Sequence, residues 1–402
     1  MTGRWKRQTL AARSHTDGRR VTRPLGTPIQ QTTTFQVATS EEQGRMLRAR
    51  DEGIYPRFGH PTPAAVAEKV AQLEGAEAAL LFSSGMAAIT TSLLTVLRPG
   101  DHVVCQREIF GQTFTFLDEM ARSFGIEVDF VDATRPEAVA GAIGPNTRLI
   151  YAETPSNPLL RVIDLAALAD LAQRHDLALA VDSTFASPWL QNPIELGADL
   201  VLHSGTKYLA GHSDVMCGVA VASAALISAI KETQILLGGV LDPHASWLML
   251  RGLRTLGVRV ERQCQTALAL ARFLEGHPAI RQVHYPFLES SPFFELASRQ
   301  MRGGGGVVSF EVAGGLDEAR AFVDSLELIP IATSLGGVES LIEIPMELDF
   351  SEAELGSAAH DTGISPGLIR LSVGLEDLAD LQEDLERGLE AVQALAASGT
   401  ES

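Results

Sequence analysis

The chain has 402 residues, of which 45% are hydrophobic and 20% are charged, and its formal net charge is −18. This length allows a large domain and a smaller one, each with its own core. The acidic balance argues against a nucleic-acid partner, because the long-range field repels a polyanion. The three cysteines are too few and too scattered for a disulfide framework or a zinc site, so we expect no metal.

The sequence contains no sign of a membrane or secretory protein. No stretch approaches the roughly 18 uninterrupted apolar residues of a membrane span. The N-terminal region is rich in Arg and Lys but lacks the apolar run of a secretory signal. We therefore expect a cytoplasmic protein with no membrane partner.

The N-terminal half begins with an arm and continues as an alternation of strands and helices. Residues 1–60 are polar and lack a sustained helical or strand period, which predicts an extended arm. From 61 to 255, short apolar runs alternate with helical stretches, a pattern typical of a parallel sheet covered by helices. The expected helices are 66–73 and 84–97, and the expected strands are 78–82, 102–105, 127–131, 147–152, 177–181, 200–202 and 219–222.

The pattern changes at about residue 256. A long helix over 258–275 is expected first, followed by strands at 307–312 and 341–344 and a final amphipathic helix over 377–397. The sequence thus predicts a large α/β domain at 61–255, with a mostly parallel sheet, and a smaller α+β domain at 256–402.

Three groups of residues follow predicted strands, where open α/β sheets bind their ligands. The first is Asp182, directly after the run 177–181. A carboxylate there can pair with a protonated pyridine nitrogen and keep the ring an electron sink. Taken alone, an aspartate that caps a turn is the more ordinary explanation.

The second group is Ser204 to Tyr208, which contains Lys207, and the third is Ser83 to Ala87, which contains Gly85. Lysine forms Schiff bases with carbonyl compounds. The start of a helix binds anions, and a glycine lets a phosphate come close. Alone, a loop lysine and a serine helix cap would be ordinary features. Together, and in this order around one sheet, the three groups indicate pyridoxal phosphate.

Several longer motifs carry a resemblance to a known family. They are Tyr55–Thr62, Ser84–Met86, Glu153–Pro158, Val181–Phe185, His203–Tyr208, Ser334–Ser340 and Ile369–Gly374. From about Thr22 to the C-terminus, the chain resembles the Cys/Met-metabolism family of pyridoxal-phosphate enzymes. That family includes cystathionine γ-synthase, cystathionine γ- and β-lyases, methionine γ-lyase and the O-acylhomoserine sulfhydrylases. The resemblance implies the pyridoxal-phosphate-dependent transferase fold of type I.

The resemblance also implies residues that hold the cofactor. Lys207 matches the Schiff-base lysine, and Asp182 matches the partner of the pyridine nitrogen. Asn157 matches the residue beside the phenolic oxygen of the cofactor. The phosphate contacts would come from Gly85, Met86, Ser204 and Thr206.

Further matches concern the substrate and a second subunit. Arg370 matches the arginine that binds the substrate α-carboxylate, assisted near Ser334. Tyr55 and Arg57 match a pair that reaches the cofactor phosphate in the active site of a neighbouring subunit. The resemblance therefore implies a homo-oligomer, at least a dimer, and the family usually forms tetramers from dimers.

Two residues bear on the reaction. Phe110 stands where the family normally has a tyrosine stacked on the cofactor ring; it keeps the stacking face but has no hydroxyl for proton transfer. Either another group, such as Tyr55, a water or Lys207, covers that step, or the chemistry has diverged toward a specialised substrate. Glu339 resembles the acidic residue that can meet the distal amino group of cystathionine or the approaching cysteine; a surface glutamate is the alternative.

We therefore expect an enzyme that acts on a small amino-acid substrate. γ-Replacement on an O-acylhomoserine with a thiol such as cysteine ranks first, and γ-elimination of the cystathionine or methionine γ-lyase kind ranks second. A non-catalytic cofactor-binding regulator is opposed by the intact Lys207, Asp182 and Arg370. A dinucleotide-dependent oxidoreductase is excluded, since no Gly-x-Gly-x-x-Gly follows the first strand.

Overall fold

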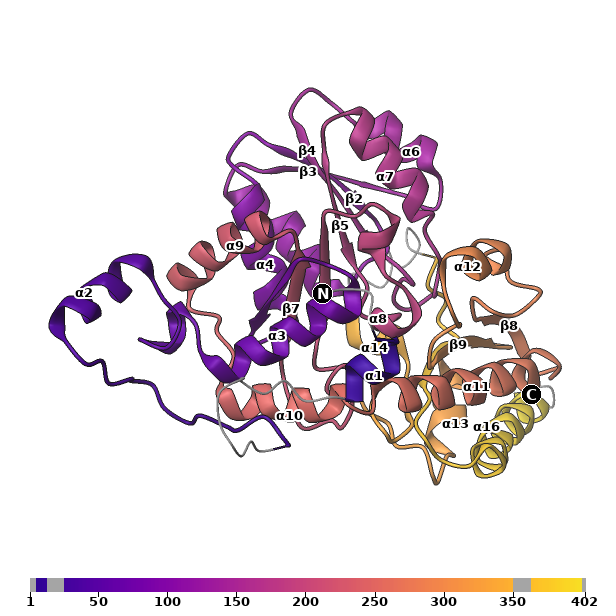
Figure 1. The fold of residues 1–402 in the computed structure, drawn as a ribbon. Helices are drawn as coiled ribbons and strands as arrows, with labels where there is room; N and C mark the ends of the chain where they lie inside the picture. The colour runs from indigo at the N-terminus through magenta and orange to yellow at the C-terminus, as the bar shows by residue number, and fades with distance from the viewer. Residues whose placement is uncertain (1–4, 13–24, 350–362, 400–402) are drawn as a thin grey trace.

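The computed structural model describes residues 5–12, 25–349 and 363–399, which form two sheets with their covering helices (Figure 1). The larger sheet has the strand order β1-β7-β6-β5-β4-β2-β3. Strands β3, β2, β4, β5 and β6 run parallel, whereas β7 is antiparallel to both of its neighbours. The strands are β1 (Ala78–Phe82), β2 (His102–Gln106), β3 (Glu127–Val131), β4 (Thr147–Glu153), β5 (Ala178–Asp182), β6 (Leu200–Ser204) and β7 (Gly218–Ala222).

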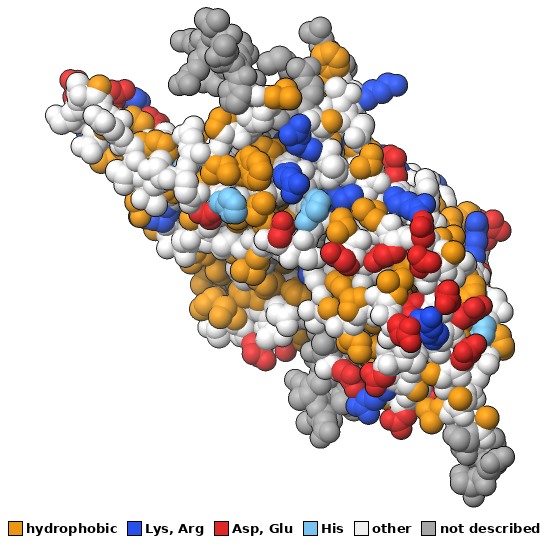
Figure 2. All heavy atoms as spheres, turned by 90° about the horizontal axis from the view of Figure 1, so that it is seen from below, with side chains coloured by type: hydrophobic (Ala, Val, Ile, Leu, Met, Phe, Trp, Pro, Cys, Tyr) orange, Lys and Arg blue, Asp and Glu red, His pale blue; other side chains and the backbone are white. Residues whose placement is uncertain are grey.

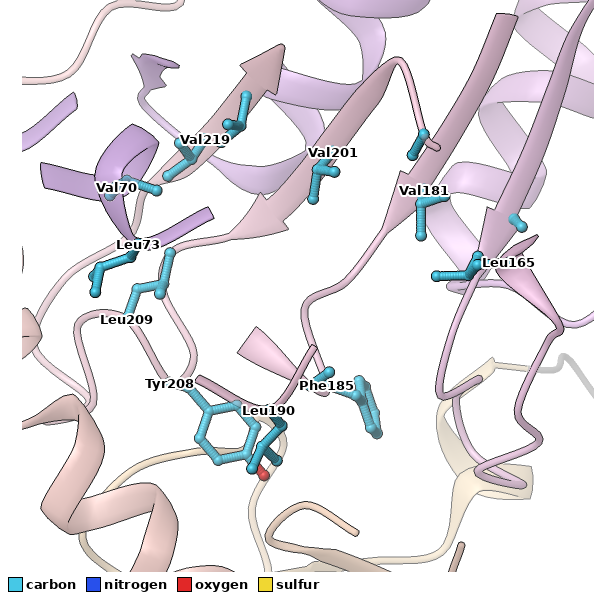
Figure 3. Close-up of a cluster of buried hydrophobic side chains, with 14 of the residues drawn as sticks. Val70, Leu73, Leu165, Val181, Phe185, Leu190, Val201, Tyr208, Leu209 and Val219 are labelled. Atoms are coloured by element: carbon cyan, nitrogen blue, oxygen red, sulfur yellow. The ribbon is translucent and has the colours of Figure 1, made fainter. Parts of the chain in front are cut away.

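Helices cover both faces of this sheet, because successive strand residues point to opposite sides. Val181, Val201 and Val219, on neighbouring strands, belong to one buried cluster (Figure 3). That cluster also holds apolar residues of α3 (Pro61–Glu74), α7 (Leu165–Arg174), α8 (Ser187–Leu190) and α10 (Pro243–Leu253). The opposite cluster holds apolar residues of α4 (Gly85–Val96), the π-helical turn η2 (Phe116–Ala121) and α9 (Ala224–Leu237). Shorter elements are α5 (Gly111–Thr115), α6 (Pro136–Ala142) and η3 (Pro193–Leu196).

The smaller sheet is antiparallel, with the order β10-β11-β9-β8. Its strands are β8 (Ile280–His284), β9 (Val307–Val312), β10 (Leu341–Glu343) and β11 (Leu368–Ser372). It shares a separate buried core with α11 (Leu256–Glu275), α13 (Leu316–Asp324) and α16 (Leu378–Gly399). Two short helices, α12 (Phe294–Gln300) and α14 (Pro345–Asp349), complete this part. The proposed division between residues 255 and 256 coincides with the start of α11.

The expectation of an extended arm without helices is wrong for part of residues 1–60. The described residues of the arm include α1 (Arg7–Ala12), α2 (Ser40–Ala49) and the 3-10 turn η1 (Pro56–Phe58), while residues 1–4 and 13–24 lie outside them. None of the residues of α2 is buried. The helix begins at a cap: the Thr39 hydroxyl accepts the Glu42 N–H. Figure 1 shows α2 projecting away from the two sheets.

None of the helices over the described residues is long and apolar enough to cross a membrane.

Candidate active site

Lys207 lies in the turn after β6, beside the loop that precedes β10. Its Nζ atom donates a hydrogen bond to the Ser334 hydroxyl at 2.7 Å. Burial, followed by the charge of Arg370, lowers the pKa of Lys207 to about 8, and the Glu343 carboxylate opposes this shift. The next residue, Tyr208, is buried, and its hydroxyl accepts the Gly306 N–H at 3.0 Å (Figure 3). Tyr208 therefore anchors this turn in the packed core, while the Lys207 amine is directed to the loop that contains Ser334.

Arg370, on β11, joins the smaller sheet to the larger one. Its Nη1 atom donates to Asn157 Oδ1 at 2.9 Å, and Nη2 donates to the Ser334 carbonyl at 3.0 Å. Nη2 also forms an ion pair with Glu343 Oε1 at 2.6 Å. The structure thus brings together four of the residues singled out in the sequence, Lys207, Ser334, Arg370 and Asn157, and adds Glu343, which was not among them.

Asp182 ends β5 and is buried. Burial raises the pKa of its carboxyl group, although Thr184 opposes the shift by donating its hydroxyl and its backbone N–H to Oδ1 at 2.6 and 2.9 Å. The Thr184 hydroxyl in turn accepts the Ser204 N–H at 2.8 Å. Asp182 is thus a buried acid whose hydrogen-bond donors are neutral, and it can form an ion pair with a cationic group. Thr184 lies within a motif noted in the sequence, but no role was assigned to it there.

The start of α4 lies against the end of β6. The Ser84 hydroxyl caps the helix by accepting the Ala87 N–H at 3.0 Å. A Cβ atom on Gly85 would lie 3.0 Å from the Ser204 Cβ, and one on Gly218 would lie 2.1 Å from the Ser84 carbonyl oxygen. A side chain at Gly218 would therefore clash with the backbone of Ser84, and one at Gly85 would crowd Ser204, so the two glycines allow the close approach of α4, β6 and β7. The first N–H groups of a helix have no partner within the helix, so this end suits an anion.

Thr206 and Met86 take up positions around the same helix start. The Thr206 hydroxyl accepts the Cys217 N–H at 2.9 Å and donates to the Cys217 carbonyl at 3.2 Å. Met86 is partly buried against the apolar cluster of α4. Met86 directly follows Gly85 in the chain, and Thr206 is two residues after Ser204.

Phe110 and Glu339 are both exposed at the edges of this region. The backbone N–H of Phe110 donates to Glu153 Oε2 at 2.9 Å, and its side chain is 39% exposed. Glu339 belongs to the same loop as Ser334, which contacts Lys207 and Arg370.

Tyr55 and Arg57 lie apart from these residues. Arg57 Nη1 donates to the Ile235 carbonyl at 3.4 Å, at the end of α9, and its guanidinium lies over the Tyr55 and Phe58 rings. Within the described part of the chain, neither Tyr55 nor Arg57 contacts Lys207, Asp182 or Arg370. The structure therefore separates this predicted pair from the rest of the site in its own subunit.

Three features fit the groups of pyridoxal phosphate. The partly buried lysine of lowered pKa suits the aldehyde, and the buried carboxylate at the neighbouring strand end suits the pyridine nitrogen. The glycine-lined helix start suits the phosphate. Fold and site together define the class of pyridoxal-phosphate enzymes. The family model for "Cys/Met metabolism PLP-dependent enzyme" matches residues 8–390, and the chain belongs to this family.

Relatives with curated names agree with this assignment. Over 369 residues the chain is 43% identical to L-methionine gamma-lyase of Pseudomonas deceptionensis, covering 91% of this chain and 92% of that protein. Over 388 residues it is 42% identical to cystathionine gamma-lyase of Bacillus subtilis, covering 96% and 100%.

A solved structure is similar over nearly the whole chain. Cystathionine gamma-lyase from Lactobacillus plantarum, complexed with L-serine, superimposes with a TM-score of 0.90 at 39% identity, covering 97% of this chain and 100% of that one. The predictions of the family, of the type I fold and of pyridoxal phosphate as cofactor are confirmed. The protein is a pyridoxal-phosphate enzyme of sulfur amino acid metabolism.

Proposed function

We propose that this enzyme catalyses γ-elimination from a sulfur-containing L-amino acid such as methionine or cystathionine. From the sequence alone, γ-replacement on an O-acylhomoserine ranks first. The two relatives described above support the reverse order, because they are named methionine and cystathionine gamma-lyase. The products would be a thiol, 2-oxobutyrate and ammonia, with one water consumed.

The observation that carries the catalytic part of the proposal is the double contact of Ser334. Its hydroxyl binds Lys207 Nζ and its carbonyl binds Arg370 Nη2, so a base and a carboxylate-binding group lie on either side of one residue. An amino acid whose carboxylate binds Arg370 would present its Cα near the Lys207 amine. A pKa of about 8 keeps a useful fraction of that amine neutral near physiological pH, as proton abstraction requires.

Each remaining residue has a proposed part. Pyridoxal phosphate supplies an electron sink for the carbanion that forms at Cα. Asp182 would hold a proton on the pyridine nitrogen through its charge, and Asn157 would interact with the phenolic oxygen. The start of α4 and the neighbouring hydroxyls would bind the phosphate, namely Gly85, Met86, Ser204 and Thr206.

Phe110 offers a ring face for stacking but no proton. We propose that Lys207 moves the protons between Cα and the later carbon positions, because its amine is the titratable group at the centre of the site. The exposed Glu339 carboxylate would meet the distal amino group when the substrate is cystathionine.

A second subunit would complete the site through Tyr55 and Arg57. In support, α2 buries no residue against its own chain, and several apolar side chains of the arm and of the end of α9 are exposed: Leu25 by 85%, Leu47 by 47%, Leu236 by 81% and Leu237 by 55%. Figure 2 shows hydrophobic side chains at the surface between the projecting arm and the C-terminal part. The acidic side chains in this view gather on the C-terminal part. Apolar surface of this kind marks protein interfaces. We propose at least a homodimer.

A product assay tests the proposed reaction. The cofactor-loaded enzyme would be given methionine, cystathionine, or O-acetyl- and O-succinylhomoserine with and without cysteine, and the products would be identified by mass spectrometry. We expect 2-oxobutyrate and a thiol from methionine or cystathionine, and none with the Lys207→Ala variant. Cystathionine formed from an acylated homoserine only when cysteine is present, without turnover of the two sulfur amino acids, would restore γ-replacement to first place.

A further inference from the structure

Glu153 is a buried carboxylate to which the proposed chemistry assigns no role. It ends β4 in the middle of the larger sheet and is only 3% exposed. Its two oxygens accept hydrogen bonds from two different loops. Oε2 accepts the Phe110 N–H and Oε1 accepts the Asn157 N–H, each at 2.9 Å. One carboxyl group therefore holds two loops at a fixed separation.

The backbone of Glu153 strengthens this connection. Its N–H donates to Gln106 Oε1 at 2.8 Å, and Gln106 Nε2 donates to the Glu108 carbonyl at 2.7 Å. The loop after β2, which leads to Phe110, is thus attached to the end of β4 through two contacts. The loop after β4 extends the chain of contacts, because the Asn157 side chain accepts a hydrogen bond from Arg370.

The charge environment shows that the carboxyl group of Glu153 is not kept for an ion pair. No Lys, Arg or His nitrogen of the described residues lies within ion-pair distance of it, and its partner in the β4–β5 register is the acid Asp182. Burial, and then Asp182, raises the pKa of Glu153 well above its usual range, while the two N–H donors oppose the shift. A buried acid beside another acid is costly. The hydrogen bonds of its two oxygens explain its presence, because they accept the N–H groups of two loops at once.

We propose that Glu153 is a positioning residue that aligns the Phe110 ring with Asn157 and, through Asn157, with Arg370. In this role it acts through the two backbone N–H groups that its oxygens accept. It thereby couples the ring proposed to stack on the cofactor to the arginine proposed to bind the substrate. This inference rests on the proposed roles of Phe110 and Asn157.

The test is Glu153→Gln, which keeps the shape but replaces one acceptor oxygen with an N–H₂ group. One of the two backbone N–H groups then loses its acceptor, so its loop shifts. We expect the apoenzyme to bind pyridoxal phosphate about tenfold more weakly, a typical result of leaving one buried donor unsatisfied. We also expect an altered visible circular dichroism band of the bound cofactor. Neither measurement needs turnover, so both test Glu153 even if γ-elimination proves to be the wrong reaction.

Thr147→Val is the matched control, at the opposite end of β4. The Thr147 hydroxyl is buried and contacts His102 Nδ1 and the Gly144 N–H, both at 2.8 Å. This variant should lower the melting temperature and leave cofactor affinity and the dichroic band unchanged. If Glu153→Gln behaved in the same way, the positioning role would be overturned in favour of a merely structural one.

A double-mutant cycle sharpens the test. Glu153→Gln and Phe110→Ala should have non-additive effects on cofactor affinity, because both act through the same ring. Additive effects would overturn the coupling. If Glu153→Gln does not fold, Glu153→Asp replaces it in both experiments. Asp keeps two acceptors but is shorter by one methylene, so it should weaken cofactor binding; unchanged affinity and dichroism would contradict the proposal.

Discussion

Arg370 and Glu343 face each other across β11 and β10 and form an ion pair in which both side chains are less than one-tenth exposed. Removing one member of a buried pair leaves the other charge uncompensated, which is strongly destabilising. Glu343 therefore holds the guanidinium in place before any substrate carboxylate arrives. The arginine is oriented by the fold itself, through the register of two adjacent strands.

Arg370→Lys tests this arrangement. Lysine keeps the charge that Glu343 needs but loses the planar fork that can bind a carboxylate with two N–H groups. We expect KM to rise by roughly ten- to a hundredfold, the loss of one hydrogen bond to a charged group, with a smaller change in kcat. Steady-state kinetics with the substrate found in the product assay would measure this. Arg387→Lys, on the surface of α16, is the control; an unchanged KM in Arg370→Lys would contradict the carboxylate-binding role.

Lys207→Ala should abolish covalent attachment of the cofactor. The parent and the variant would both be treated with a reductant, denatured and dialysed. The parent should keep the absorption of the bound cofactor, whereas the variant should lose it and should show no turnover. Lys231→Ala is a suitable comparison, because Lys231 lies on α9 and only approaches Glu52, at 3.8 Å. Cofactor that stayed bound to denatured Lys207→Ala after reduction would place the attachment elsewhere.

The pKa of Lys207 predicts how recombination with the cofactor depends on pH. Only the neutral amine attacks an aldehyde, and burial together with Arg370 lowers the pKa of Lys207 to about 8. The rate at which apoenzyme recombines with pyridoxal phosphate should therefore rise with pH through a midpoint near 8. Glu343→Gln removes the charge that opposes the shift, so it should lower the midpoint further. Stopped-flow absorbance would detect this; a midpoint near the ordinary 10.5 of lysine would contradict it.

Phe110→Ala should weaken cofactor binding by about three- to tenfold, since stacking of aromatic rings contributes roughly that much beyond burial. Phe110→Tyr should bind the cofactor like the parent and change kcat less than about tenfold, because Lys207 already carries the proton transfers in the proposed mechanism. Cofactor titration and steady-state kinetics separate the two effects. A hundredfold gain in kcat with tyrosine would show instead that the missing hydroxyl limits the reaction.

Mixing two inactive variants tests whether Arg57 acts in the neighbouring subunit. Arg57→Ala alone should lose cofactor, and Lys207→Ala alone should lose turnover. In a mixed dimer, the site that retains Lys207 would receive Arg57 from the other chain, so unfolding and refolding the two variants together should restore part of the activity. Mixtures that stay inactive, from chains that do associate, would place Arg57 in the site of its own subunit.

The sequence predicted the strands of the larger sheet closely because most of them are short apolar runs, such as 78–82 and 219–222, with turn residues around them. Asp182 and Lys207 could be found for a related reason, since Asp182 follows one such run directly and Lys207 lies in the turn after another. Helix α2 could not be predicted from periodicity, because its large apolar residues, Met46 and Leu47, are adjacent and give no period, and its start depends on the Thr39 cap.

Glu343 and Glu153 could not be assigned for a different reason. The contacts of Glu343 depend on the register of β10 against β11, and the Glu153 carboxylate binds the distant Phe110. A charged residue directly after the apolar run Leu149–Ala152 was the available signal for Glu153. Which groups it would accept depends on folding, not on local pattern.

The isolation of α2 has a consequence for how the enzyme behaves on dilution. A helix of ten residues that buries none of them is marginal by itself in water. If the arm is ordered by a second chain, then mass action links arm folding, subunit association and completion of the phosphate site. Specific activity would then fall as the enzyme is diluted, and excess cofactor would slow that fall by favouring the associated form.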